Sequence, residues 1–341
     1  MGASERGGGE VYAGAGDGKP PVILVRRAGK PLAAAMRERF RVLDFFKSGE
    51  PLTAFLATAA AAPEPPRAAV VASGCGVRVD ASFLGAIPSL CCVVSTAAGL
   101  DHIDLAECAR RGVAVANSGE VYSTDVADCA VGLLLDVLRK LSASGRYVRR
   151  GSWPVHGGYP IPLGSKLAGK RVGIIGLGNI GSRIARRLQA FGCIIHYNSR
   201  KQNNSVSYKY FPNVHDLAAE SDVLVVACTL NEATRHVVNK DVLEALGRDG
   251  VLVNVGRGAN VDEVELVSAL KDGKIAGAGL DVFQHEPEVP TELFSMDNVV
   301  LSPHAAVCTQ ESRTDLHAHT IGNLVAFFSG QPLLSPVSTT Y

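Results

Sequence analysis

The sequence predicts an α/β protein with two doubly wound parallel-sheet domains. Short apolar β-like runs alternate with helix-like segments along most of the 341 residues. This alternation is typical of a parallel sheet with helices on both faces. The β-like runs are continuously apolar, as expected of strands that are covered on both faces. The length is also that of about two domains of roughly 150 residues each.

In the first part of the chain, apolar runs predict strands at 22–25, 68–72, 90–95 and 113–116, with helices at 32–39, 52–61, 80–87 and 104–111. A longer helix is expected at 123–148, because acidic residues lie near its start and basic residues near its end, which suits the helix dipole. The irregular stretch 149–170 contains Trp153 and several prolines and glycines, and we interpret it as an inter-domain or subunit arm.

A second α/β run follows this arm. Strands are expected at 172–175, 194–197, 223–227, 251–254, 275–280 and 299–301, and helices at 179–191, 214–220, 240–246, 262–272 and 309–329.

Composition and charge exclude several classes of protein. Lys plus Arg is 34 and Asp plus Glu is 33, a formal net charge of +1, so the basic footprint of a nucleic-acid partner is missing. No stretch reaches the roughly 20 apolar residues that span a bilayer. The segment 1–20 is Gly-rich and partly acidic and lacks an apolar signal core, so we expect a disordered tail there.

The eight cysteines favour a cytoplasmic protein with reduced, buried thiols. They form no CxxC pair, and no Cys/His spacing suits structural zinc, so no metal site is expected.

A glycine motif predicts a dinucleotide site. Gly176, Gly178 and Gly181 form G-x-G-x-x-G after an apolar strand, and Asn179 and Ile180 open an amphipathic helix. In this context Gly176 permits the turn, Gly178 lets a pyrophosphate approach, and Gly181 packs the helix against the strand. The helix N-terminus offers N–H groups to the phosphates. The alternative is a Gly-rich strand–helix turn without a ligand.

The residues after the next strand predict a preference for NADPH. An Asp or Glu about 20 residues beyond the motif would hold the ribose 2′-hydroxyl of NAD. Ser199, Arg200 and Lys201 stand there instead, and these cations suit a 2′-phosphate. The alternative is a solvated basic turn.

Three further residues predict the chemistry. Arg257, Glu286 and His304 follow second-half strands, at the ends where open α/β sheets bind ligands. When hydride reaches a carbonyl carbon, the oxygen needs a proton, which His304 supplies and the Glu286 carboxylate helps to retain. Arg257 can polarise the carbonyl and pair with a substrate carboxylate. Taken singly, each residue also fits a packing or turn role, but together they describe reduction of a 2-oxo acid.

These motifs resemble the D-isomer-specific 2-hydroxyacid dehydrogenase family from about residue 22 to 337. The spacings of 29 residues from Arg257 to Glu286 and 18 from Glu286 to His304 look like those of the family. The segments 125–128, 146–151 and 198–201 are similar to the plant-type glyoxylate/hydroxypyruvate and hydroxyphenylpyruvate reductases, a subgroup that uses NADPH.

The resemblance implies a Rossmann cofactor domain at 121–305 and a flavodoxin-like, discontinuous substrate domain at 21–120 and 306–341. It implies that the backbone N–H groups of Ala98 and Gly99 bind the substrate carboxylate, and that Asp281 holds the nicotinamide amide. Thr229 and Val255 match positions that line the cofactor.

The resemblance also implies a homodimer formed through the cofactor domain. Trp153 either reaches a partner's active site or simply packs, and Cys75 borders the substrate site. Ala306 departs from many relatives, which have Gly there, and its methyl group narrows the expected pocket.

The sequence therefore predicts an NADP(H)-dependent reductase of small 2-oxo acids, glyoxylate and hydroxypyruvate first, with 4-hydroxyphenylpyruvate as the alternative. A rival from another class is a dinucleotide-sensing binding module like the C-terminal-binding corepressors, which share the fold and a similar triad. The residues at 198–201 argue against that rival, since those proteins carry an acid at the ribose position and this chain does not.

Overall fold

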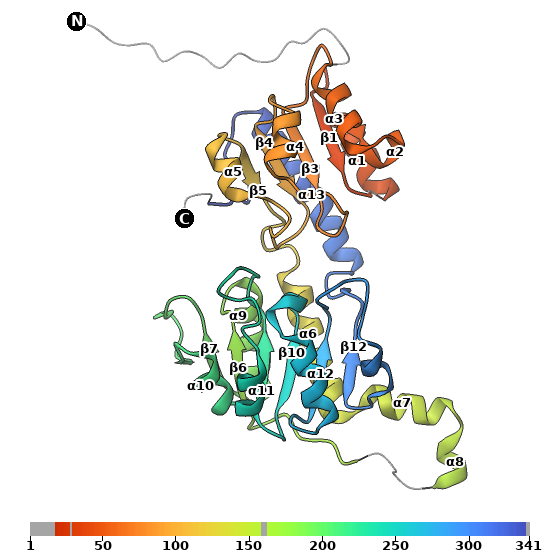
Figure 1. Cartoon of the computed structure of the whole chain (residues 1–341), viewed down its shortest axis with the longest axis vertical. Helices are drawn as coiled ribbons and strands as arrows, with labels where there is room; N and C mark the ends of the chain where they lie inside the picture. Colours follow the sequence, from red (N-terminus) through yellow and green to blue (C-terminus); the bar gives the residue numbers. More distant parts are fainter. Residues whose placement is uncertain (1–17, 28, 158–161, 339–341) are drawn as a thin grey trace, which may run out of the picture. The chain divides into compact units, whose positions relative to one another are not determined.

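The computed structural model describes residues 18–27, 29–157 and 162–338, which fold into two compact units (Figure 1). The chain leaves the first unit after Gly119 and returns to it at Leu316, whereas we expected the return at residue 306. Most of the expected tail, residues 1–17, lies outside the described residues.

The first unit is a five-stranded parallel sheet in the order β2-β1-β3-β4-β5. Its strands are β1 (Pro21–Val25), β2 (Arg41–Asp44), β3 (Ala68–Val71), β4 (Cys92–Ser95) and β5 (Ala114–Ala116). Its helices are α1 (Lys30–Arg39), α2 (Phe45–Ser48), α3 (Leu52–Ala60), α4 (Ala81–Ala86), α5 (Leu105–Arg110) and the later part of α13 (Gln310–Phe328). The order is that of a flavodoxin-like doubly wound sheet, as predicted.

The second unit is a seven-stranded parallel sheet in the order β12-β11-β10-β9-β6-β7-β8. Its strands are β6 (Arg171–Ile175), β7 (Ile194–Asn198), β8 (Lys209–Tyr210), β9 (Val223–Val226), β10 (Val251–Asn254), β11 (Gly277–Leu280) and β12 (Val299–Leu301). Its α-helices are α6 (Ser123–Arg139), α7 (Leu141–Arg149), α8 (Ser152–His156), α9 (Asn179–Ala190), α10 (Val214–Ala219), α11 (Lys240–Leu246) and α12 (Glu263–Lys271); the 3-10 helices are Gly258–Asn260 and Thr291–Ser295. The strand order confirms the Rossmann prediction.

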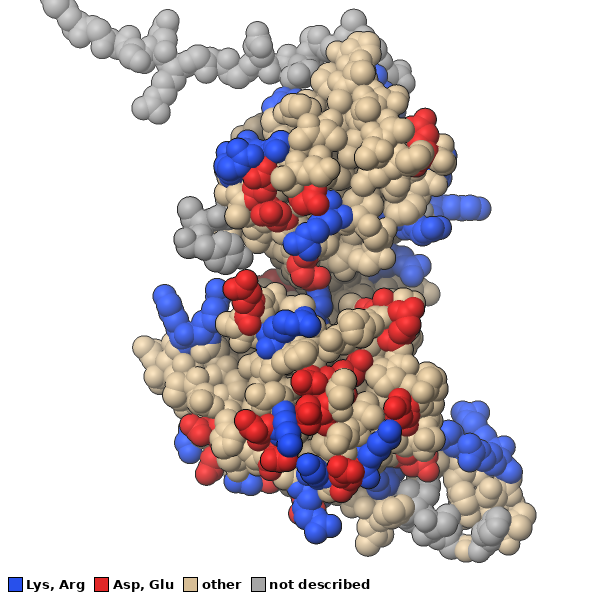
Figure 2. Space-filling view, viewed as in Figure 1, with Lys and Arg blue, Asp and Glu red and all other residues tan. Residues whose placement is uncertain are grey.

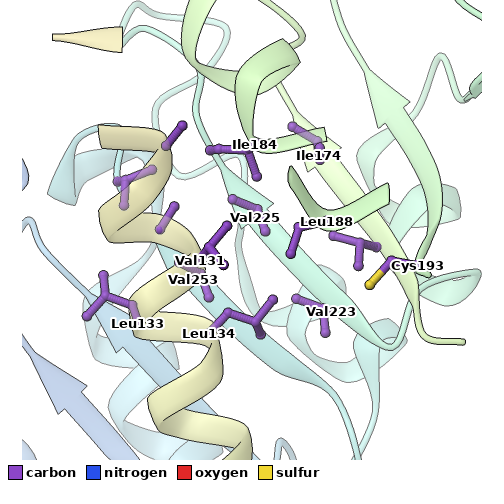
Figure 3. Packing of buried hydrophobic residues seen from close by; sticks show 14 of the residues in the cluster. Val131, Leu133, Leu134, Ile174, Ile184, Leu188, Cys193, Val223, Val225 and Val253 are labelled. Atoms are coloured by element: carbon purple, nitrogen blue, oxygen red, sulfur yellow. The ribbon is translucent and has the colours of Figure 1, made fainter. Parts of the chain in front are cut away.

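Both faces of the second sheet are covered, which explains its continuously apolar strands. In β9, Val223 and Val225 pack in one cluster with α6 and α9, while Leu224 and Val226 pack in another with α10, α11 and α12. Figure 3 shows Leu134 and Val131 of α6 and Leu188 of α9 lying over Val223 and Val225. Because successive strand residues point to opposite faces, a doubly covered strand is mostly apolar along its whole length.

The helix expected at 123–148 is wrong in one respect: it breaks at Lys140, which has a left-handed φ of 53°. The Asp136 carboxylate explains the break, because it accepts hydrogen bonds from the Ser142 amide at 2.7 Å and the Ser142 hydroxyl at 2.5 Å. A side chain that bonds an N–H at the start of a helix caps that helix, so α7 begins anew. Helix α8 lies in the stretch expected to be irregular, of which 158–161 lie outside the described residues.

Acidic and basic side chains are interspersed over the face of each unit drawn in Figure 2, and basic ones gather over the α7–α8 arm. None of the helices in the described ranges is long and apolar enough to cross a membrane.

Candidate active site

The predicted site residues of the second unit all follow the carboxyl ends of strands in one parallel sheet. Gly176 follows β6, Ser199 follows β7, Arg257 follows β10, Asp281 follows β11 and His304 comes soon after β12. Parallel strands end at the same edge, so these loops share that edge of the sheet. The strand order reverses at β6, which has β7 on one side and β9 on the other. Open α/β sheets bind ligands at such a switch point.

The glycine motif fits a bound pyrophosphate. A Cβ on Gly176, whose φ is 96°, would lie 2.8 Å from the Cys228 backbone, and a Cβ on Gly181 would lie 1.9 Å from the Gly176 carbonyl oxygen. Packing therefore requires these glycines. A Cβ on Gly178 would meet nothing within 4 Å, so the open space there remains for a ligand. Helix α9 starts after Gly178 without a side-chain cap, which leaves N–H groups for phosphate oxygens.

The loop after β7 presents two exposed cations. The Ser199 hydroxyl donates to the Lys201 carbonyl at 2.6 Å, and the Tyr210 hydroxyl donates to the Ser199 carbonyl at 3.2 Å. The side chains of Arg200 and Lys201 are exposed, and neither forms an ion pair within the described residues. Both charges are thus available to an anion from solvent.

Two asparagines fix the loop that carries Arg257. Asn254 accepts from the Gly256 N–H at 3.0 Å and donates to the Arg257 carbonyl at 2.9 Å. Asn260 accepts from the Arg257 N–H at 2.8 Å. A Cβ on Gly258 would lie 1.9 Å from the Phe283 carbonyl carbon, so the loops after β10 and β11 are pressed together. These asparagines were not among the predicted site residues, although an Asn at a strand end is a frequent turn former.

Glu286 and His304 form a direct pair. The His304 Nδ1 lies 2.8 Å from the Glu286 Oε2, and the Phe283 N–H donates to Glu286 Oε1 at 2.9 Å. A carboxylate accepts, so Nδ1 carries hydrogen and Nε2 remains to exchange a proton with a ligand. Burial raises the pKa of Glu286, but the hydrogen bonds from His304 and Phe283 and the charges of His304 and Arg257 outweigh burial and leave the pKa below its usual value.

Asp281 holds the loop that carries His304. Its carboxylate is buried and accepts from the Ser302 hydroxyl at 2.5 Å, the Ala305 N–H at 2.8 Å and the Ala306 N–H at 3.2 Å. Its backbone carbonyl accepts from the His304 N–H at 2.7 Å. His304 itself has a left-handed φ of 52°, a conformation that costs energy in a non-glycine residue. Asp281 was predicted to hold the nicotinamide amide, and its hydrogen bonds to this loop were not predicted.

The other predicted residues form few hydrogen bonds within the described residues. The Thr229 carbonyl accepts from the Thr234 hydroxyl at 2.7 Å, and Val255 is buried. Trp153 on α8 is 59% exposed, and the Cys75 thiol donates to the Ala72 carbonyl at 2.9 Å. Ala98 and Gly99 lie in the loop after β4 of the first unit.

Fold and site together define the class, a dinucleotide-dependent oxidoreductase. Residues 131–306 match the family described as D-isomer-specific 2-hydroxyacid dehydrogenase, NAD-binding domain. A glyoxylate/hydroxypyruvate reductase of Arabidopsis thaliana is 50% identical over 94% of this chain and 98% of its own length. A hydroxyphenylpyruvate reductase of Plectranthus scutellarioides is 50% identical over 80% of this chain and 85% of its own.

A solved structure gives the same result. The NADPH-dependent glyoxylate/hydroxypyruvate reductase of Sinorhizobium meliloti, in complex with NADP and malonate, has a TM-score of 0.85 and 37% identity, and covers 94% of this chain and 98% of its own. The chain therefore belongs to the D-isomer-specific 2-hydroxyacid dehydrogenase family.

Proposed function

We propose that the protein is an NADPH-dependent reductase of small 2-oxo acids, which converts glyoxylate to glycolate and hydroxypyruvate to D-glycerate. The observation that carries the proposal is the His304–Glu286 pair at 2.8 Å, formed close enough to Arg257 for its charge to act on the carboxylate. The relatives named for these substrates support it, at up to 50% identity.

Each residue has a separate role in this mechanism. The cofactor, when bound, supplies a hydride to the 2-oxo carbon. Arg257 binds the substrate carboxylate and polarises the 2-oxo group, and the N–H groups of Ala98 and Gly99 bind the same carboxylate. His304 donates the proton from Nε2 to the oxygen as negative charge develops there. Glu286 orients the imidazole through Nδ1 and places a negative charge beside it.

The dinucleotide would be held along the switch point of the second sheet. The glycine loop and the start of α9, with Gly178, Asn179, Ile180 and Thr229, would bind the pyrophosphate side. Ser199, Arg200 and Lys201 would bind the 2′-phosphate, which is why we propose a preference for NADPH over NADH. The NADP complex of the Sinorhizobium meliloti neighbour supports this preference.

We further propose a cytoplasmic homodimer that uses the α7–α8 arm. Leu141, Val148, Trp153 and Val155 of the arm are 52% to 76% exposed. Exposed apolar residues of this size gathered on one projecting segment are typical of a subunit interface. Light scattering of the wild type, and of a Trp153→Ser/Val155→Ser variant that should yield monomers, tests this part of the proposal.

The first experiment follows the loss of NADPH absorbance with glyoxylate, hydroxypyruvate and 4-hydroxyphenylpyruvate, and repeats each assay with NADH. Fast turnover of the two small acids with NADPH is the expected result. Preference for the aromatic acid would instead support the second candidate, which the Plectranthus scutellarioides relative favours. Tight dinucleotide binding without turnover of any acid would revive the binding-module rival.

A further inference from the structure

The loop after β4 has two carbonyl groups that are held by one neighbouring segment. The Ser118 N–H donates to the Ala97 carbonyl at 3.2 Å, and the Asn117 side-chain amide donates to the Ala98 carbonyl at 3.0 Å. Two adjacent peptide groups therefore turn their oxygens toward residues 117 and 118.

This arrangement determines where the N–H groups of the loop point. In a planar trans peptide the N–H points away from the carbonyl of the preceding residue. The Ala98 N–H is therefore directed away from the Ala97 oxygen, and the Gly99 N–H away from the Ala98 oxygen. Neither N–H has an acceptor within the ranges that the structure describes. Successive free N–H groups turned the same way form a concave site for an anion.

Two further hydrogen bonds restrain Asn117 itself. Its side-chain oxygen accepts from the Gly119 N–H at 2.9 Å, and its backbone oxygen accepts from the Ser335 hydroxyl at 2.6 Å. The His319 Nε2 lies 2.8 Å from that hydroxyl. Because the hydroxyl hydrogen goes to the Asn117 carbonyl, Nε2 must be the donor of this second bond. The chain from His319 through Ser335 thus restrains Asn117.

We propose that Asn117 is a positioning residue for the 2-oxo acid. It does not touch the substrate; it holds the Ala98 carbonyl so that the Ala98 and Gly99 N–H groups face the substrate carboxylate. The inference rests on the proposed function, because it takes the carboxylate of that substrate as the anion bound. His319 and Ser335 support Asn117 in this role.

The test compares Asn117→Ala and Asn117→Asp with a matched control. Asp keeps the shape of Asn but cannot donate to the Ala98 carbonyl. Asn298→Ala is the control, since Asn298 also donates its side-chain amide to a carbonyl, that of Ala276, in the second unit. We expect the KM for glyoxylate to rise about tenfold in both Asn117 variants, with kcat within about threefold, because a contact shared by ground and transition states is weakened.

Two readouts separate positioning from general damage. The Kd for NADPH and the thermal unfolding midpoint of Asn117→Asp should match those of Asn298→Ala. The Kd for oxamate, a carboxylate that does not react, should rise about tenfold together with the KM, since both report uniform binding. Ser335→Ala, which releases only the Asn117 carbonyl, should raise both values about threefold.

The outcomes distinguish the inference from the function on which it rests. An unchanged KM and oxamate Kd in Asn117→Asp would overturn the inference while leaving the reductase activity intact. Equal falls in kcat and in NADPH affinity would also overturn it, since they indicate a damaged fold. A wild type that reduces no 2-oxo acid, but binds oxamate in an Asn117-dependent way, would overturn the proposed function and retain the inference.

Discussion

Two groups of loops at the same edge of the second sheet are built very differently. The loop after β12, which carries His304, is tied by hydrogen bonds to Asp281. The loops after β10 and β11, which carry Arg257 and Glu286, are pressed together at Gly258. The loop after β7, which carries Arg200 and Lys201, is exposed, and those two side chains form no ion pair within the described residues.

The difference fits the roles that we propose for the two groups. The proposed proton transfer needs a donor held to within a fraction of an ångström, and His304 is fixed by its backbone, by Glu286 and through Asp281. Recognition of a phosphate by long cationic side chains tolerates more freedom, because charge attracts over several directions. The loops after β10, β11 and β12 and the exposed loop after β7 lie on opposite sides of the switch point at β6.

The largest expected effect comes from the rigid side. His304→Gln keeps a polar side chain but removes the proton donor, so kcat for glyoxylate should fall about a thousandfold. The fall in kcat is measured by following the loss of NADPH absorbance in a stopped-flow instrument. The Kd for NADPH, measured by fluorescence quenching, should stay within about twofold, because the imidazole is not needed for phosphate binding. Turnover near that of the wild type would contradict the assigned role.

The second effect tests the exposed side. Arg200→Ala/Lys201→Ala should raise the KM for NADPH about thirtyfold through lost charge-assisted hydrogen bonds, and leave the KM for NADH nearly unchanged. Arg248→Ala is the control, since Arg248 is also exposed but precedes β10, at the opposite edge of the sheet. If the KM values for NADPH and NADH rise equally, the loop after β7 does not recognise the 2′-phosphate.

Much of the structure that carries Arg257 and His304 could be predicted from the sequence. Strands such as 251–254 and 299–301 match the structure because residues covered on both faces must be apolar. Because these strands could be located, Arg257 and His304 could be placed just after their carboxyl ends. The strand β2 was missed because Arg41 is exposed and the run is short, as is usual at a sheet edge.

The hydrogen bonds that orient the site could not be predicted. Asp136, which caps α7, and Asp281, which holds the loop after β12, act on residues that packing brings near, and neither leaves a periodic pattern in the sequence. Asn117 acts on Ala98, 19 residues earlier. Such contacts depend on tertiary structure, whereas hydrophobic patterns report only which face of an element is covered.

The third largest effect should come from removing the negative charge of Glu286 beside His304. The lowered pKa of Glu286 keeps its carboxylate ionised even in mildly acidic solution, so a charged acceptor remains beside the His304 Nδ1. Glu286→Gln removes the charge and retains an acceptor. At neutral pH, kcat/KM for glyoxylate should then be about tenfold lower. The fall in kcat/KM that the wild type shows in acid, where Glu286 takes up a proton, should be absent in this variant. Glu288→Gln, an exposed neighbour, is the control and should leave the pH profile of kcat/KM unchanged.

The smallest expected effect is on the rate at which the cysteine thiols react, which depends on how deeply each one is buried. Burial raises the pKa of the Cys228 thiol, which lies against Gly176, to about 11, and that of Cys92 to about 12. Thiolate is the reactive form, so at pH 7.5 these groups hold less than about one part in a thousand of it. Cys308, just beyond the His304 loop, is exposed. Iodoacetamide followed by peptide mass spectrometry should therefore label Cys308 first, with activity changed less than about twofold. Rapid labelling of Cys228 instead would mean that the glycine loop after β6, which lies between the two compared groups of loops, opens in solution.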